Sequence, residues 1–201
     1  MTRYQKQRKR LLSAIVVLSM ILVCLCTVAY AKYMESIAVG GGTVTISADI
    51  GTIYLQEHEA VRNAHGAYEL TDEPGENKYY ILMPGVDIPK DPYVTVKKTS
   101  TLEAYVFIKV DAELPDGVSF QLTDVWQAVK GKSGVYVYCQ NGEPVKVVGD
   151  IESIPVLKDN KIFVSQKYQG GECQFQITAY LYQVAAGQDA AEVYGEYPNS
   201  N

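Results

Sequence analysis

Residues 135–148 read Val-Tyr-Val-Tyr-Cys-Gln-Asn-Gly-Glu-Pro-Val-Lys-Val-Val, a stretch with a hairpin signal at its centre. The two runs Val135–Cys139 and Pro144–Val148 are rich in β-branched and aromatic residues, which favour strands. Asn141-Gly142 stands between them, and this dipeptide favours the tight turn of an antiparallel hairpin. We therefore expect two neighbouring antiparallel strands here.

The rest of the chain repeats this pattern of short strand-like runs separated by turn residues. From Thr43 to Ile50 apolar and polar residues alternate, as in a strand with one buried and one solvated face. The further runs are Thr52–Leu55, Lys78–Met83, Tyr93–Lys97, Ala104–Val110, Val118–Leu122, Lys161–Ser165 and Glu172–Val184. Turn signals between runs are Pro84-Gly85, Pro115-Asp116-Gly117, Gly131–Gly134, Asp159-Asn160 and Gly170-Gly171. About eight to ten short strands predict an all-β fold, a jelly-roll-like antiparallel β-sandwich.

Length and charge narrow the class of protein. The 201 residues suffice for one domain with a real core, and we expect that domain at 32–201. Five of the 18 basic residues lie before residue 32, so the remainder carries 13 basic and 23 acidic residues, a net charge of −10. Such a surface argues against nucleic acid or anionic lipid as a partner.

The N-terminus is typical of an export signal. Met1–Arg10 is basic, Leu11–Val28 carries no charge, and Ala29-Tyr30-Ala31 provides small residues at a cleavage site. We therefore predict a signal peptide at 1–31, in helical form, and a secreted, cell-surface-associated product that meets the membrane only before signal peptidase acts. The alternative is an uncleaved anchor, because 18 apolar residues can just span a bilayer.

Two stretches break the strand pattern. Residues 56–77 are polar and acidic, and we expect a surface excursion with a helical turn over Glu57–Ala64. Near the C-terminus, Gln188–Tyr194 predicts a short helix that caps the sandwich. Cys139 and Cys173 both fall in strand-like runs, which leaves a cross-strand disulfide and two buried free thiols as equal alternatives.

The residues that carry chemistry do not form a recognisable site. His58-Glu59 is followed by Arg62 where a His-Glu-x-x-His zinc motif needs its second histidine, and His65 comes too late for a shared ion. We assign no catalytic, cofactor-binding or metal-binding residue, expect no cofactor, and do not predict an enzyme. The tyrosine pairs Tyr136/Tyr138 and Tyr180/Tyr182 each lie on one strand face, where cross-strand packing is the favoured role.

Three segments together resemble a known family. They are the export signal running into Ala29–Tyr33, the run Met83–Val96 with its Pro-Gly-x-Asp-x-x-Lys-Asp-Pro motif, and Ile177–Gln183 leading into the alanine-rich 185–193. This combination resembles the TasA/camelysin family of Gram-positive bacteria. The resemblance spans most of residues 10–195, and the motif at 84–92 is its most specific part.

The resemblance implies a jelly-roll subunit of extracellular biofilm matrix fibres, with itself as partner. In such fibres the strand around 32–48 would complete the sheet of the next subunit by β-strand addition. Gly40-Gly41-Gly42 provides a flexible joint for this exchange, although the segment 32–39 could equally fold onto its own domain. The alternatives from other classes are a camelysin-like metal-dependent endopeptidase, for which no residue here carries the motif, and a monomeric cell-surface binding module.

Overall fold

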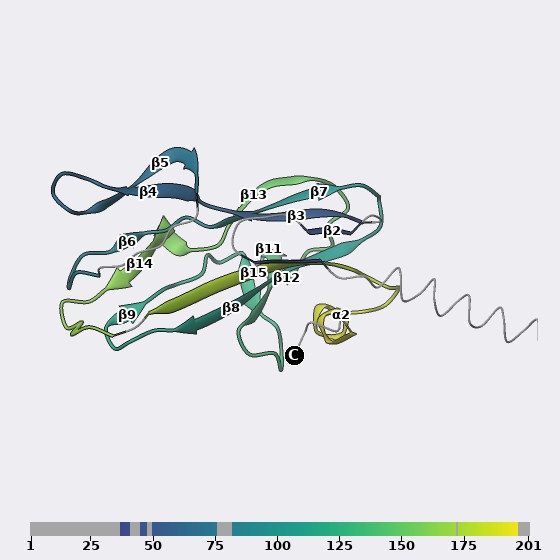
Figure 1. The fold of residues 1–201 in the computed structure, drawn as a ribbon. Helices are drawn as coiled ribbons and strands as arrows, with labels where there is room; N and C mark the ends of the chain where they lie inside the picture. Colours follow the sequence, from purple (N-terminus) through teal and green to yellow (C-terminus); the bar gives the residue numbers. More distant parts are fainter. Residues whose placement is uncertain (1–36, 41–44, 48–49, 76–81, 172, 197–201) are drawn as a thin grey trace, which may run out of the picture. The chain divides into compact units, whose positions relative to one another are not determined.

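The structure of the chain is a computed structural model that describes residues 37–40, 45–47, 50–75, 82–171 and 173–196 (Figure 1). The predicted signal peptide at 1–31 and its helix lie outside these residues, as do the predicted strand residues 43–44, 48–49 and 78–81. Within the described part of the chain, no helix has both the length and the apolar character that a membrane crossing requires.

The larger of the two main sheets is antiparallel and is organised around its two longest strands. These are β8 (Ala104–Glu113) and β15 (Gln174–Gln183), which pair without interruption from Ala104↔Gln183 to Glu113↔Gln174. The other strands of this sheet are β1 (Ile37–Gly40), β10 (Trp126–Ala128), β11 (Val135–Gln140) and β12 (Glu143–Pro144). The order is β1-β15-β8-β11-β10, with β12 also on β11, so β1 forms one edge.

A second antiparallel sheet faces the first (Figure 1). It has the order β13-β7-β3-β2, formed by β13 (Ile151–Pro155), β7 (Tyr93–Lys98), β3 (Gly51–Gln56) and β2 (Thr45–Ser47). Smaller elements are β4 (His58–Arg62) with β5 (Tyr68–Pro74), and β6 (Ile88–Pro89) with β14 (Lys161–Val164) and β9 (Val118–Ser119). A 3-10 turn η1 (Lys158–Asn160) and one helix, α2 (Ala190–Glu196), complete the description.

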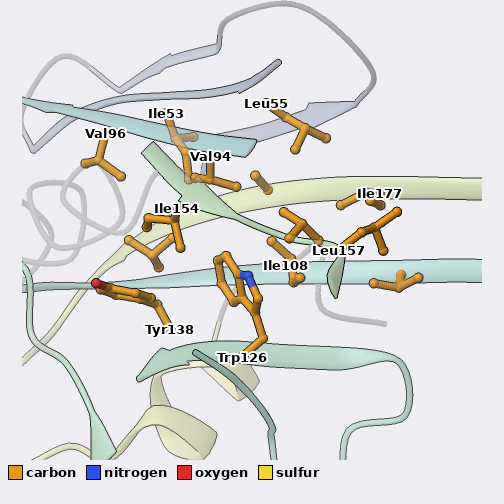
Figure 2. Close-up of a cluster of buried hydrophobic side chains, with 14 of the residues drawn as sticks. Ile53, Leu55, Val94, Val96, Ile108, Trp126, Tyr138, Ile154, Leu157 and Ile177 are labelled. Carbon is orange, nitrogen blue, oxygen red and sulfur yellow. The ribbon is translucent and has the colours of Figure 1, made fainter. Parts of the chain in front are cut away.

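The core lies between the two main sheets. Alternation along β3 buries Ile53 and Leu55, which meet side chains of the opposite sheet such as Ile108 and Ile177 (Figure 2). Trp126 lies in the same cluster, and its indole N–H donates a hydrogen bond of 2.9 Å to the carbonyl of Pro155 on β13. This bond connects the far edge of one sheet to the edge of the other and satisfies a polar atom inside the core.

The hairpin prediction at 135–148 is confirmed at its turn. Asn141 and Gly142 have φ of 52° and 84°, the left-handed values that a type I′ turn requires at both central residues, and β11 pairs with β12 across them. Most other predicted strands are also present, and the antiparallel all-β class is confirmed. The predicted C-terminal helix is present as α2, which begins at Ala190.

Several predictions were wrong in detail. The polar stretch after Gln56 forms the β4–β5 hairpin, so the helical turn predicted over Glu57–Ala64 is absent. The chain is extended over His58–Arg62 and then enters the hairpin turn. Leu82 and Met83 lie outside any strand, and Val118–Leu122 contributes only the two residues of β9. Of the strand predicted over Pro144–Val148, only Pro144 lies in a strand, β12, and Val147 forms an isolated bridge to Ala104. The short strands β6, β10 and β13 were not predicted. Cys139 is buried and Cys173 exposed, both as free thiols, so neither alternative for the cysteines holds in full.

Replacement of Ile108 by alanine tests the shared core. Ile108 has no exposed surface, so Ile108→Ala should leave a cavity and lower the free energy of unfolding by about 2–5 kcal/mol. Leu102, 39% exposed, is the control, and Leu102→Ala should change stability by less than about 0.5 kcal/mol. Urea titration followed by the fluorescence of Trp126, the single tryptophan, measures both. Equal losses at the two positions would contradict this core.

Candidate functional site

The edge of the larger sheet at β15 is the candidate functional site. β1 pairs with β15 in an antiparallel register from Ile37↔Leu181 to Gly40↔Thr178. β1 has four residues and β15 has ten, so β1 covers only part of the longer strand. This short edge strand is the first described segment of the chain.

β15 is buried on both faces over residues 179–182, which overlap the stretch that pairs with β1. Ile177, Ala179 and Leu181 belong to the core between the sheets. The alternate residues Tyr180 and Tyr182 point to the outer face of the sheet, because successive side chains of a strand point in opposite directions. They are buried as well, at 5% and 0% exposure, so the outer face carries a cover of its own.

Helix α2 provides that cover. The ring of Tyr194 packs 5.2 Å from Phe107, 6.0 Å from Tyr180 and 5.7 Å from Tyr182, measured between ring centroids. We call these four residues the outer aromatic cluster. Their tilted and edge-to-face geometries are favourable arrangements for aromatic pairs. The packing role predicted for the Tyr180/Tyr182 pair is therefore confirmed, with ring centroids 5.4 Å apart.

The start of α2 is held by a reciprocal capping box. The Asp189 carboxylate accepts hydrogen bonds from the backbone N–H groups of Ala191 and Glu192, each at 2.9 Å. In return the Glu192 carboxylate accepts one from the backbone N–H of Asp189 at 3.0 Å. A helix this short is unstable by itself, so the cap and the packing of Ala190, Val193 and Tyr194 hold it on the sheet.

Burial sets the electrostatics of the outer aromatic cluster. It raises the pKa of Tyr194 to about 12, with smaller contributions from the charges of Tyr180 and Asp111. Burial also raises the pKa of Tyr180. The Tyr194 hydroxyl is enclosed and has no hydrogen-bond partner in the part of the chain that the structure describes. Tyr194 therefore contributes to the packing of α2 on the sheet through its ring.

The chemistry that this edge can perform is backbone hydrogen bonding. Without β1, the N–H and C=O groups of β15 opposite β1 would be unpaired, and an unpaired strand edge binds another strand readily. The geometry accommodates one extended segment, in the antiparallel register that β1 occupies.

A second polar cluster connects the β4–β5 hairpin to the motif at 84–92. Lys90 Nζ lies 2.6 Å from Glu57 Oε2, with both side chains largely buried. Asp91 binds His58 twice, through the backbone N–H at 3.0 Å and through Nδ1 at 2.6 Å. We call these two pairs the hairpin clip.

The third charged residue of the motif binds elsewhere. Asp87 lies 3.0 Å from Lys161 Nζ and accepts a hydrogen bond from the Val164 backbone N–H at 3.2 Å. Gly85 has φ of 75°, a value that glycine adopts without strain. The motif thus binds β14 on one side and the hairpin on the other, a structural role.

The residues considered for zinc are not brought together. His58 begins β4, whereas His65 lies in the turn beyond Arg62, where its N–H donates to Asn63. A rise of about 3.3 Å per residue places Arg62 about 13 Å from His58, and His65 lies past that point. Among residues 37–40, 45–47, 50–75, 82–171 and 173–196, no group of three or more His, Cys, Asp or Glu side chains is arranged to hold a metal ion.

Sequence reasoning did not find the hairpin clip, and it predicted a helix that caps the sandwich without placing that helix on β15. Both pairs of the clip join residues 33 positions apart, a separation at which no local pattern exists. The cover had a usable signal, because Asp189-x-x-Glu192 has the spacing of a capping box at the start of a helix.

The hairpin clip can be tested at Asp91. Asp91→Asn keeps the size of the side chain but removes its charge, so it should weaken the bonds to His58 and lower the free energy of unfolding by about 1–3 kcal/mol. Amide hydrogen exchange within β4 and β5 should increase with it. Asp72→Asn, at an exposed position on the same hairpin, is the matched control and should change little. The same exchange in both variants would show that the clip does not hold the hairpin.

Alkaline pH tests the burial of Tyr194. Its pKa is about 12 when folded and about 10 when unfolded, so the unfolded chain loses the proton first. The contribution of this pKa difference to the free energy of unfolding is therefore complete below about pH 10. It is lost as the pH rises towards about 12. Tyr194→Phe removes the titrating group, so its unfolding free energy should fall less over this range. Urea titrations followed by circular dichroism compare the two proteins, and parallel curves would contradict the buried hydroxyl.

No protein-family model matches the chain, and no curated protein or solved structure matches it either. The resemblance to the TasA/camelysin family therefore stays a prediction based on the residues quoted for it.

Proposed function

We propose that the chain is an exported structural subunit of extracellular fibres or cell-surface assemblies, which associates with copies of itself by β-strand addition. The segment around 32–48 of one copy is the donor, and the β15 edge of the next copy is the acceptor. Backbone hydrogen bonds supply the affinity, and the alternating side chains set the register.

Residues 37–40 pair with β15 of their own chain, which is the alternative given above for the segment 32–39. The observation that carries this proposal is that this pairing marks the edge and the register that a strand from a second copy would occupy. β1 is short and lies at a sheet edge, and glycine at Gly40 ends it. A strand from a second copy would make the same backbone bonds in the same register, so exchange costs little enthalpy. A donor and an acceptor at different places on one molecule form a head-to-tail contact, which produces open filaments when it does not close into a ring.

A jelly-roll-like topology is part of the proposal. The neighbours β7 and β13 lie in one sheet. β8 follows β7 directly and lies in the other sheet beside β15, which the chain reaches from β13 by way of β14 in the three-stranded sheet. Antiparallel neighbours whose connections cross from one sheet to the other are consistent with Greek-key topology. Such a fold leaves a sheet edge for strand addition.

Export is part of the same function. A basic, then apolar, then Ala-x-Ala N-terminus fits cleavage after Ala31, which would leave the donor segment at the start of the secreted chain. The acidic body fits a partner other than nucleic acid or anionic lipid.

Electron microscopy of the processed protein at rising concentration tests the function. Fibres should appear above a threshold concentration, and deletion of residues 32–42 should abolish them because the donor strand is then missing. Val148→Ser, at a 54% exposed position outside the proposed contact, is the control and should assemble normally. Trp126 fluorescence checks that each variant is folded.

Other outcomes would contradict the proposal. Unchanged assembly of the deletion variant would reject strand addition. Proteolysis that a chelator and His58→Ala both abolish would indicate an endopeptidase. A protein that stays monomeric and binds wall glycan would indicate a surface binding module.

A further inference from the structure

The outer aromatic cluster lies on the strand that would accept a donor. Tyr180 stands opposite Ala38 of β1, and on its outer side it contacts the ring of Tyr194. Phe107, on the neighbouring strand β8, contacts the same ring. Helix α2 therefore packs over the part of β15 that pairs with β1.

An acceptor strand has to survive the departure of its own edge strand. Without β1, β15 keeps hydrogen bonds to β8 on one side only, and strands at sheet edges fray most easily. Its inner face remains fixed by the core, through Ala179 and Leu181. Its outer face stays in place only while α2 remains packed on Tyr180 and Tyr182.

The surroundings of Tyr194 indicate which part of its side chain this packing depends on. Its side chain is fully buried, and its hydroxyl has no hydrogen-bond partner within the described residues. A buried hydroxyl without a partner costs free energy, so the ring alone must account for the packing. Phenylalanine should therefore replace tyrosine without loss, whereas alanine would remove every ring contact.

We propose that α2 is a brace that keeps β15 ordered as the acceptor for a strand from a second copy of this chain. The inference rests on the proposed function, because it assigns a role to α2 in the same strand addition. A preformed acceptor means that only the incoming strand loses conformational freedom on binding, and this raises its affinity. Loosening α2 lets β15 fray. The fraying weakens binding of the donor strand at the β15 edge, although α2 itself makes no backbone contact with that edge.

Two measurements on the full chain test the brace. The first is amide hydrogen exchange along Thr178–Leu181. The second is binding of a fluorescent synthetic peptide with the sequence of residues 32–47, the donor segment. Tyr194→Ala should speed exchange and weaken peptide binding by about tenfold or more, because it empties the space under α2. Tyr194→Phe, the matched control, should match the wild-type protein within about twofold.

Amides of β3 and β7 report whether the variants keep their fold. They should stay protected in Tyr194→Ala, since these strands lie in the other sheet. If this variant unfolds, Asp189→Ala takes its place, because it removes the capping acceptor and loosens α2 without a cavity. Its expected effect is smaller, about fivefold, in the same direction.

The outcomes separate the brace from the function on which it rests. If the wild-type protein binds the peptide and forms fibres while Tyr194→Ala binds the peptide equally well, the brace is wrong and strand addition stands. If the wild-type protein neither binds the peptide nor assembles, strand addition is wrong, and the acceptor role of α2 is wrong with it. Faster exchange together with weaker binding in Tyr194→Ala, but not in Tyr194→Phe, supports the brace.

Discussion

The antiparallel ladder between β8 and β15 is the interaction on which the other features depend. It joins Ala104–Glu113 to Gln174–Gln183 without a register shift, although the paired residues lie far apart in the sequence. Because side chains alternate along both strands, one ladder supplies two apolar surfaces. The inner surface forms one half of the core, and the outer surface is covered by α2.

The two apolar surfaces explain how β15 could stay ordered at its edge and accept a strand from a second copy, as we propose. A strand packed on one face only would lose order once its neighbour left, whereas β15 has packing on both faces and a full partner in β8. The edge that we propose as acceptor and the helix that we propose as its brace both depend on this alternation of residues. The hairpin clip has a different role. Its two pairs, His58–Asp91 and Glu57–Lys90, bind the acidic β4–β5 hairpin to the motif at 84–92. A two-stranded hairpin is only marginally stable by itself, which accounts for the need for such contacts.

Local patterns predicted much of the fold. Alternation and turn residues located β3, β7, β8, β11, β14 and β15, because these strands bury one or both faces against a core and need apolar residues there. The β4–β5 hairpin was missed because its outward face is solvated and acidic, so composition resembled that of a loop. Its turn nevertheless contains two residues typical of turns. The Asn63 side chain accepts hydrogen bonds from the backbone N–H groups of His65 and Ala67, and Gly66 has a φ of 83°. The strands β6 and β10 have two and three residues, too few for a period to show. β13 has five residues, but only Ile154 is buried, so its burial does not alternate.

The sequence by itself determined the all-β class, the position of the Asn141-Gly142 turn and the presence of a C-terminal helix, because each depends on conformational preferences of neighbouring residues. Only the tertiary structure decided which strands pair, that α2 lies on Tyr180 and Tyr182, that Cys139 and Cys173 stay apart as free thiols, and that Asp91 meets His58. These contacts join residues distant along the chain. Their partners are selected by the packing of the whole core, and no local preference records that selection.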